Sequence, residues 1–447
     1  MIKSFGSFIF IYLLVGLMLI APVSVKAYSV LTHEALIDAS WEKSILPLLK
    51  LKYPASTDDD LNKARAFAYG GSILPDLGYF PFGSIYFTNL AHYARTGDFV
   101  EALISESENL NEYAFSLGVL CHYMGDKYGH PIATNIIEPR VYPKIEKKFG
   151  HVVTFEKDHV AHKRVEIAFD VLEISRGNYA SQTYHNFIGF QVSRPVLERA
   201  FLKTYGQDIN VVFGDLGLTI ATFRWSIKSL LPTITHIAWE IKKRDIRLKN
   251  PSVNSRSFHY KMNKKQYYAE FGKARKRPGL KAMILSGIIW VIPKIGPLRV
   301  LRFKDVGPEG EKLFIRSFDT TLLHYASALN KLHVQKALIP DIDYDTGKPT
   351  LMGEYDLADK TYGELVIKLE KTKFNNLTAP LKQNILNYYS KSDSASLSRI
   401  DPKQWKKTYQ DLQTLKVTQT IKADSLKNAK GEYYKLNEPI EKPVTGK

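Results

Sequence analysis

The chain has 447 residues, enough for one large domain and a second unit, and 45% of them are hydrophobic, which excludes wholesale disorder. A single cysteine excludes an internal disulfide, so the fold must be held by its core or by metal ions. The formal net charge of +17 favours anionic partners, such as phospholipid head groups, nucleic acid or a negatively charged cell surface, and does not determine the fold.

The first expected element is an export signal over residues 1–27. Lys3 gives a positive start, an apolar run follows over residues 8–23, and residues 25–27 fit the small-residue rule for cleavage. Cleavage there makes Tyr28 the first mature residue and predicts a secreted or periplasmic protein. The alternative is an uncleaved membrane anchor, because the apolar run is nearly long enough to span a bilayer.

Residues 28–245 are expected to form one all-α domain. Apolar residues recur at three- and four-residue spacing over residues 111–128, 158–174 and 213–243, and sustained strand alternation is scarce. Glycine and proline mark expected loops, for example at residues 69–76 and 129–131.

A basic stretch follows, with 14 Lys and Arg against two acidic residues between Lys242 and Lys281. The apolar run 282–292 comes next and is too short to cross a bilayer. It is either a buried helix of a second domain or a membrane-dipping element, with Trp290 at the interface and the lysines on anionic lipid.

The remainder of the chain is expected to be mostly helical. Residues 246–423 form a basic, mostly helical C-terminal region of unassigned role, with a turn-rich stretch at residues 341–349. Residues 424–447 are rich in lysine and lack periodicity, so a flexible tail is expected there.

Six of the twelve histidines lie between His92 and His162. Within this window His122, Asp126 and His130 follow one another at steps of four, which places neighbouring members on one helix face. Gly129 and Pro131 predict that this helix ends at His130. Imidazole and carboxylate groups are zinc ligands, and a carboxylate between two histidines can bridge two ions. The alternative is a buried polar stripe satisfied by hydrogen bonds.

Other candidate ligands are less distinctive. His162 and Glu166 are one helical turn apart, although His159 could replace His162 and a solvated helix face would show the same pattern. Asp76 lies in an expected loop, where a helix cap is the simpler role. His92 has an apolar context that also suits a buried structural histidine.

His33 is notable for its position. After cleavage it would be the sixth mature residue, one loop away from the free amine of Tyr28. A terminal amine and its neighbouring carbonyl can chelate a metal once the signal has been removed.

These residues, in this order, resemble the zinc-dependent phospholipase C and nuclease P1/S1 superfamily. The Asp126 to His130 spacing is most similar to that in the phospholipase-like domain of glycosylphosphatidylinositol-specific phospholipase D. The resemblance covers residues 28–245 and depends on the whole ordered set rather than on one motif. It implies a bundle of α-helices with metals in a cleft, to which the sequence pattern adds a mostly helical C-terminal region.

The resemblance also implies up to three zinc ions. The first ion would be held by Asp76, His92, His122 and Asp126. The second would be held by His130, His162 and Glu166. The third would be held by the amine and carbonyl of Tyr28, by His33 and by the other oxygen of Asp126.

The expected function is that of a secreted zinc-dependent phosphodiesterase, most simply a phospholipase C that releases diacylglycerol and a phosphorylated head group at an anionic membrane surface. Asp76 would act as general base or orient the nucleophile. One alternative is a P1/S1-type nuclease that binds nucleic acid, with aromatic platforms among Phe80, Phe82, Tyr86, Phe87 and Tyr93. The other is a catalytically silent, zinc-binding, membrane-associated protein. The oligomeric state is left open.

Overall fold

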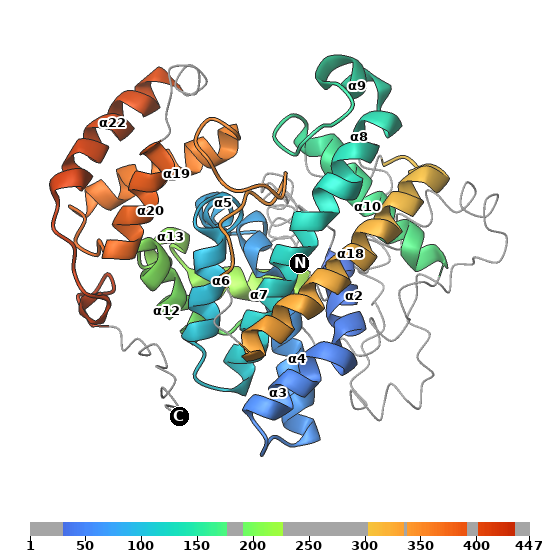
Figure 1. Ribbon diagram of the computed structural model, residues 1–447, viewed down its shortest axis with the longest axis horizontal. Coiled ribbons are helices and arrows are strands. Elements are labelled where there is room, and N and C mark those ends of the chain that lie inside the picture. The colour runs from blue at the N-terminus through green and yellow to red at the C-terminus, as the bar shows by residue number, and fades with distance from the viewer. Residues whose placement is uncertain (1–29, 177–190, 227–302, 335–337, 391–400, 434–447) are drawn as a thin grey trace, which may run out of the picture.

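The computed structural model describes residues 30–176, 191–226, 303–334, 338–390 and 401–433 (Figure 1). Within these residues the regular structure is helical, and extended pairing is limited to three isolated bridges. The predicted all-α fold class is therefore confirmed. Among the described helices, none combines the length and apolarity needed to cross a bilayer. The export signal, Tyr28, the basic stretch 242–281 and the apolar run 282–292 lie outside the described residues.

The helices are joined by short 3-10 and π-helical segments. Before the first gap they are α2 (Val30–Ser40), η1 (Trp41–Ile45), α3 (Leu46–Lys52), α4 (Asp58–Ile73), η2 (Leu74–Tyr79), α5 (Ile85–Tyr93), α6 (Thr96–Ser105), α7 (Leu110–Gly129), η3 (His130–Thr134), α8 (Asn135–Val141), α9 (Pro143–Phe149) and α10 (His159–Arg176). After it come α12 (Arg194–Tyr205), α13 (Ile209–Phe213), α14 (Leu216–Trp225), α18 (Gly307–Val334), α19 (Asp356–Lys371), α20 (Ala379–Ser390), α22 (Pro402–Val417) and η7 (Ala423–Ser425).

Helix α7 forms the centre of the molecule and contacts α2, α4, α6 and α18. The Asn109 side chain caps its start by accepting from the backbone N–H of Glu112 at 3.1 Å, which satisfies one of the free donors of the first turn. The helix is buried on nearly every side from Glu112 to Asp126. A helix surrounded in this way can carry polar side chains only if they meet partners inside the protein.

Helices α4 and α7 cross with their backbones almost in contact. A Cβ atom on Gly71 would lie 2.0 Å from the carbonyl oxygen of Phe115, and one on Gly118 would lie 2.1 Å from that of Ala68. Only glycine fits at such an approach. The crossing brings the C-terminal end of α4 against the middle of α7, so that the segment after α4 lies beside His122.

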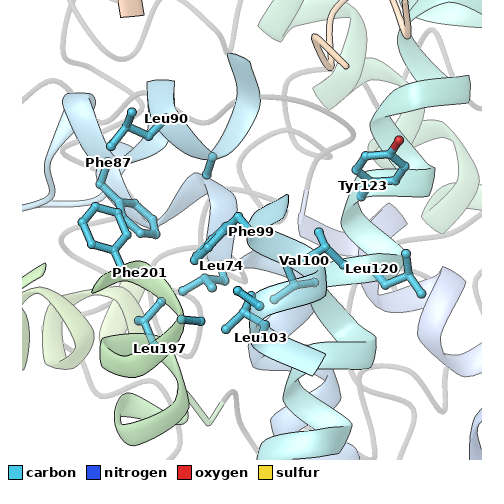
Figure 2. Packing of buried hydrophobic residues seen from close by; sticks show 14 of the residues in the cluster. Leu74, Phe87, Leu90, Phe99, Val100, Leu103, Leu120, Tyr123, Leu197 and Phe201 are labelled. Atoms are coloured by element: carbon cyan, nitrogen blue, oxygen red, sulfur yellow. The ribbon is translucent and has the colours of Figure 1, made fainter. Parts of the chain in front are cut away.

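The apolar core continues from this crossing into the neighbouring helices. Figure 2 shows side chains such as Phe87, Phe99 and Phe201 packed together from α5, α6 and α12. The same buried cluster includes Tyr325 and Leu329 of α18. The described C-terminal helices therefore share the core of the N-terminal helices, and Figure 1 shows α18 lying across α7 and α2.

Three local expectations are corrected. The stretch 69–76, expected as a loop, is the end of α4 and the start of the 3-10 helix η2, which carries Asp76. Helix α7 ends at Gly129 as expected, but the chain continues as a π-helical turn rather than a loop. Pro131 has no N–H to continue the hydrogen-bond ladder of α7, which accounts for the change of helix type at this point. The expected helical run 213–243 is interrupted at Gly214, and residues 227–243 lie outside the described part.

Candidate metal centre

Buried histidines and carboxylates meet where α2, η2, α5, α7, η3 and α10 converge. Three groups bring their nitrogen and oxygen atoms close enough together to hold a metal ion: His33, His122 and Asp126; Asp76, His92 and His122; and His130, His162 and Glu166. All of these side chains are buried. The structure thus brings together the eight predicted ligands that it describes, although they come from six separate elements.

Asp126 lies at the centre of the first two groups. Its Oδ2 is 3.1 Å from Nε2 of His122 and 3.6 Å from Nε2 of His92, while Oδ1 is 3.4 Å from Nε2 of His33. Two ligand atoms of a tetrahedral zinc ion, each at about 2.0–2.1 Å, lie about 3.3 Å apart. The two oxygens of Asp126 therefore face different sets of histidines at separations that suit a bridging carboxylate.

Asp76 and His33 complete this region from opposite sides. The Oδ1 atom of Asp76 is 3.5 Å from Nε2 of His92, which places Asp76 with the His92 and His122 pair. The ring of His33 stacks on that of His122 with centroids 4.2 Å apart. This stacking keeps the His33 imidazole on the Oδ1 side of Asp126.

The second cluster is built around Glu166 of α10. Its Oε1 is 2.9 Å from Nε2 of His162 and 3.6 Å from Nε2 of His130. His162 and Glu166 share one face of α10, as their spacing of four predicted. His159 is exposed and lies against the ring of Phe155, so His162 rather than His159 belongs to this cluster.

In three histidines the Nδ1 nitrogen, which faces away from the ligand clusters, is hydrogen-bonded to a backbone carbonyl. Nδ1 of His92 donates to the carbonyl of Thr88 at 2.8 Å, and Nδ1 of His122 donates to that of Ser72 at 2.8 Å. Nδ1 of His130 donates to a backbone carbonyl at 3.1 Å. A hydrogen at Nδ1 leaves the lone pair of the neutral ring on Nε2, the atom that faces the cluster.

Several inward-facing atoms have no hydrogen-bond partner among the residues that the structure describes. They are Nε2 of His92, His122 and His130, both carboxylate oxygens of Asp126, Oδ1 of Asp76 and Oε1 of Glu166. Proteins rarely bury so many polar atoms in one place without partners. A donor set of imidazole nitrogens and carboxylate oxygens at these spacings fits zinc. The lone cysteine, Cys121, is buried on α7 and belongs to none of the three groups.

Charges also act between the residues around Asp126 and the cluster of His130, His162 and Glu166. Burial opposes ionisation of Asp126, but the neighbouring His122 and His130 outweigh it and hold the pKa of Asp126 well below its usual range. Burial disfavours a charged His130, yet the negative charge of Asp126 raises the pKa of His130 well above its usual value. Likewise, Glu166 overcomes burial and raises the pKa of His162 to about 9. Without metal, protons therefore compensate the buried carboxylates.

Two carboxylates beside the clusters were missed by the sequence analysis. Oε2 of Glu138, on α8, is 3.3 Å from Nδ1 of His162, and Oδ1 of Asp345 is 3.4 Å from Nδ1 of His130. Burial raises the pKa of Glu138 to about 7. Carboxylates placed behind ligating histidines orient the rings and make them stronger ligands. Sequence spacing does not identify Glu138 or Asp345, because each contacts its histidine only in the tertiary structure.

Asp345 belongs to the turn-rich stretch 341–349. Its side chain accepts from the Tyr93 hydroxyl at 3.0 Å and from the Tyr355 hydroxyl, and its backbone carbonyl accepts from the side-chain amide of Asn135 at 2.7 Å. The backbone N–H of Tyr344 donates to the carbonyl of His92 at 3.1 Å. This C-terminal segment is therefore part of the wall of the site.

The sequence comparisons agree with the chemistry of these side chains. Residues 32–214, less than half of the chain, match a family model described as zinc dependent phospholipase C. The match supports a relationship of this part of the chain to the zinc-dependent phospholipase C superfamily, and it spans all eight ligand candidates that the structure describes. No curated protein and no solved structure shows a significant match. The closer similarity to the glycosylphosphatidylinositol-specific branch stays a prediction.

Proposed function

We propose that the chain is a secreted zinc-dependent phospholipase C that hydrolyses phospholipids to diacylglycerol and a phosphorylated head group. The observation that carries this proposal is the arrangement around Asp126, whose two oxygens face two sets of histidines at zinc-like separations. The family match to residues 32–214 supports the reaction class. The net charge of +17 favours an anionic lipid surface as the place of action.

We assign the ligands to the sets that the family resemblance implies. Asp76, His92, His122 and Asp126 would hold one ion, and His130, His162 and Glu166 a second. His33 and the remaining oxygen of Asp126 would contribute to a third, together with the backbone of Tyr28, which lies outside the described residues. When bound, zinc supplies Lewis-acid stabilisation of phosphoryl charge and makes water more acidic near neutral pH.

The protein's own side chains perform the remaining tasks. Asp76 presents a carboxylate oxygen toward the clusters from η2 and can accept a proton from the attacking water or orient that water. Glu138 holds His162 from behind. Asp345 and the Tyr344 carbonyl hold His130 in the same way, so its Nε2 stays directed at Glu166.

The proposal is tested by phosphorus NMR of mixed phospholipid vesicles incubated with the purified mature protein, with and without a zinc chelator. We expect phosphorylated head groups to appear, to stop appearing with chelator and to return when zinc is added back. The head groups released give the lipid preference. A zinc-loaded protein that leaves every lipid intact but degrades single-stranded DNA would replace the phospholipase by a nuclease. Turnover of neither substrate would contradict both activities.

A further inference from the structure

A buried lysine lies beside the two clusters and has no role in the ligand sets. Lys163 follows His162 on α10 and is only 8% exposed. Its Nζ lies 5.7 Å from the centroid of the Phe155 ring and 6.0 Å from that of Tyr79. The charges of Glu166 and Asp76 act on its ammonium group. Lys163 also lies three residues, about one helical turn, before Glu166 on α10.

The ring of Tyr79, which Lys163 approaches, lies beside the candidate metal centre. Tyr79 follows Asp76 by three residues in the 3-10 helix η2, where such residues lie one above the other. Its ring meets that of His92 edge-on at 6.3 Å. The charges of Asp76, Asp345 and Asp126 all act on its hydroxyl. The ring that Lys163 approaches therefore borders the candidate metal centre on the side of His92.

The ammonium of Lys163 lacks an ion pair in the part of the chain that the structure describes: no carboxylate lies within 4.0 Å of its Nζ. Burying a charge without a close partner is unfavourable, and contacts with two rings at about 6 Å offset only part of that cost. Asp76 and Glu166 compensate it at longer range. If these two carboxylates bind zinc, their charge is used by the metal, and the ammonium then needs another anion.

We propose that Lys163 binds a non-bridging phosphoryl oxygen of the substrate and thereby contributes to the affinity for the phosphodiester group. The proposal rests on the phosphodiesterase activity proposed above for the choice of substrate. The anion site itself follows from the position of Lys163. An ammonium is a compact point charge on a flexible stem, which suits a phosphoryl group held at varying orientations. No covalent step is assigned to Lys163.

The test uses the full mature chain loaded with zinc and inorganic phosphate as the probe, with binding measured by calorimetry. We expect K163M to raise the Kd of phosphate about tenfold to a hundredfold, the effect of losing a charged hydrogen bond. Zinc content should stay unchanged, because Lys163 is not a ligand. K163R keeps the charge and stacks on aromatic rings, so it should recover most of the affinity.

Lys52→Met is the matched control. Lys52 also stacks on a ring, with its Nζ 3.9 Å from the centroid of Tyr113, and it belongs to none of the three candidate metal groups. Its replacement should leave phosphate affinity at the wild-type value. With a phosphodiester substrate, K163M should lower kcat/KM, and K163R should restore it.

Three results overturn the proposal: phosphate affinity of K163M equal to wild type, phosphate affinity of K163R no better than that of K163M, or loss of zinc from both variants, which would make the lysine structural. Where K163M fails to fold, K163Q carries the same comparison. The two proposals fail separately. A wild-type protein that hydrolyses no phosphodiester, but whose phosphate affinity depends on the charge at residue 163, contradicts only the proposed function. An active wild type with an equally active K163M contradicts only the role of Lys163.

Discussion

Asp126 brings the helices α2, α5 and α7 together through one carboxylate, because each oxygen lies near a histidine from a different direction. Replacing it by asparagine keeps the volume of the side chain but removes the negative charge and one ligand oxygen. We expect Asp126→Asn to reduce zinc content and to lower activity more than the roughly 10- to 100-fold caused by losing an outer-shell partner. Metal analysis and phosphorus NMR measure the two effects.

The control for this variant is Asp215→Asn. Asp215 caps α14, where asparagine caps equally well, and it belongs to none of the candidate metal groups. Its replacement should change neither zinc content nor activity. Full zinc content and full activity in Asp126→Asn would exclude the bridging role of this carboxylate.

The protonation of His162 predicts how zinc binding depends on pH. Burial opposes its charge, but Glu166 and Glu138 raise the pKa of His162 to about 9, above the usual value of about 6.5. Zinc must displace this proton, so zinc affinity should rise as pH increases toward 9. In the zinc-free protein the sign is opposite: the stability contributed by charged His162 is complete below pH about 6.5 and is lost as pH rises through about 9.

Titration calorimetry of zinc binding in buffers with different ionisation enthalpies counts the protons released. We expect proton release at pH 7 and less release above pH 9. Thermal unfolding of the zinc-free protein between pH 6 and 10 tests whether its stability falls as pH rises through about 9. Zinc binding that releases no proton at pH 7 would contradict this account.

The sequence identified these ligands because helix spacing carries information about side chains on one face. His122 with Asp126, and His162 with Glu166, could be paired from their separation of four residues alone. Asp76, His92 and His33 were weaker candidates on their own, and the resemblance to a known family assigned them to ligand sets. Glu138 and Asp345 could not be found, since their contacts with His162 and His130 depend on tertiary packing.

At the scale of elements, the segment of residues 341–349 is the least expected part of the site. The backbone N–H of Tyr344 donates a hydrogen bond to α5, and the Asp345 carboxylate lies beside Nδ1 of His130. We expect Asp345→Asn to weaken zinc binding at the His130, His162 and Glu166 cluster about 10- to 100-fold, because the ring loses the carboxylate that orients it. Competition with a chromophoric chelator measures the affinity.

Asp356→Asn is the matched control for Asp345→Asn. Asp356 begins α19 and is partly exposed, so its replacement should leave zinc affinity unchanged. If Asp345→Asn binds zinc as tightly as the wild type, the segment only covers the site and does not tune it.

Helix types were predicted with uneven success for a physical reason. The ends of the long helices α7 and α10 were predicted to within two residues, because apolar residues recur at three- and four-residue spacing over several turns. Residues 69–76 and 129–131, which overlap η2 and η3, were expected as loops because their glycines and prolines signal irregular backbone. Tertiary packing keeps both segments helical, and both carry candidate ligands.

At the scale of the whole molecule, α18 joins the C-terminal part to the metal-binding part. The Tyr325 hydroxyl donates to the carbonyl of Leu117 on α7 at 2.8 Å, and Leu329 is 2% exposed within the same core. Truncating Leu329 to alanine should cost about 2–5 kcal/mol of stability. Since the core is shared, the urea midpoints of zinc release and of helix loss should both be lower in Leu329→Ala than in the wild type.

Leu323→Ala tests the same helix on its exposed side. Leu323 is 69% exposed, so its replacement should change stability by about 0.5 kcal/mol or less. If Leu329→Ala shifts the loss of helicity but leaves zinc release unchanged, the C-terminal helices unfold independently of the metal centre. The boundary near residue 245 stays a prediction, because it lies outside the described residues.

The arrangement of the C-terminal helices could not be predicted, because periodicity shows that a helix has an apolar face but not which neighbour covers it. Helix α18 covers α7 and α2, whereas α19 contacts α5 and α22 (Figure 1). The family resemblance ended near residue 245 and gave no guide to these contacts.

The placement of residues 341–349 against His130 has a consequence for biosynthesis. During translation the ligand candidates from His33 to Glu166 leave the ribosome long before Asp345, and chains begin to fold from the N-terminus as they emerge. An emerging chain can therefore gather its histidines and carboxylates, but His130 lacks its orienting carboxylate until most of the chain has been made. We expect stalled chains that end before residue 341 to exchange zinc faster than the completed protein.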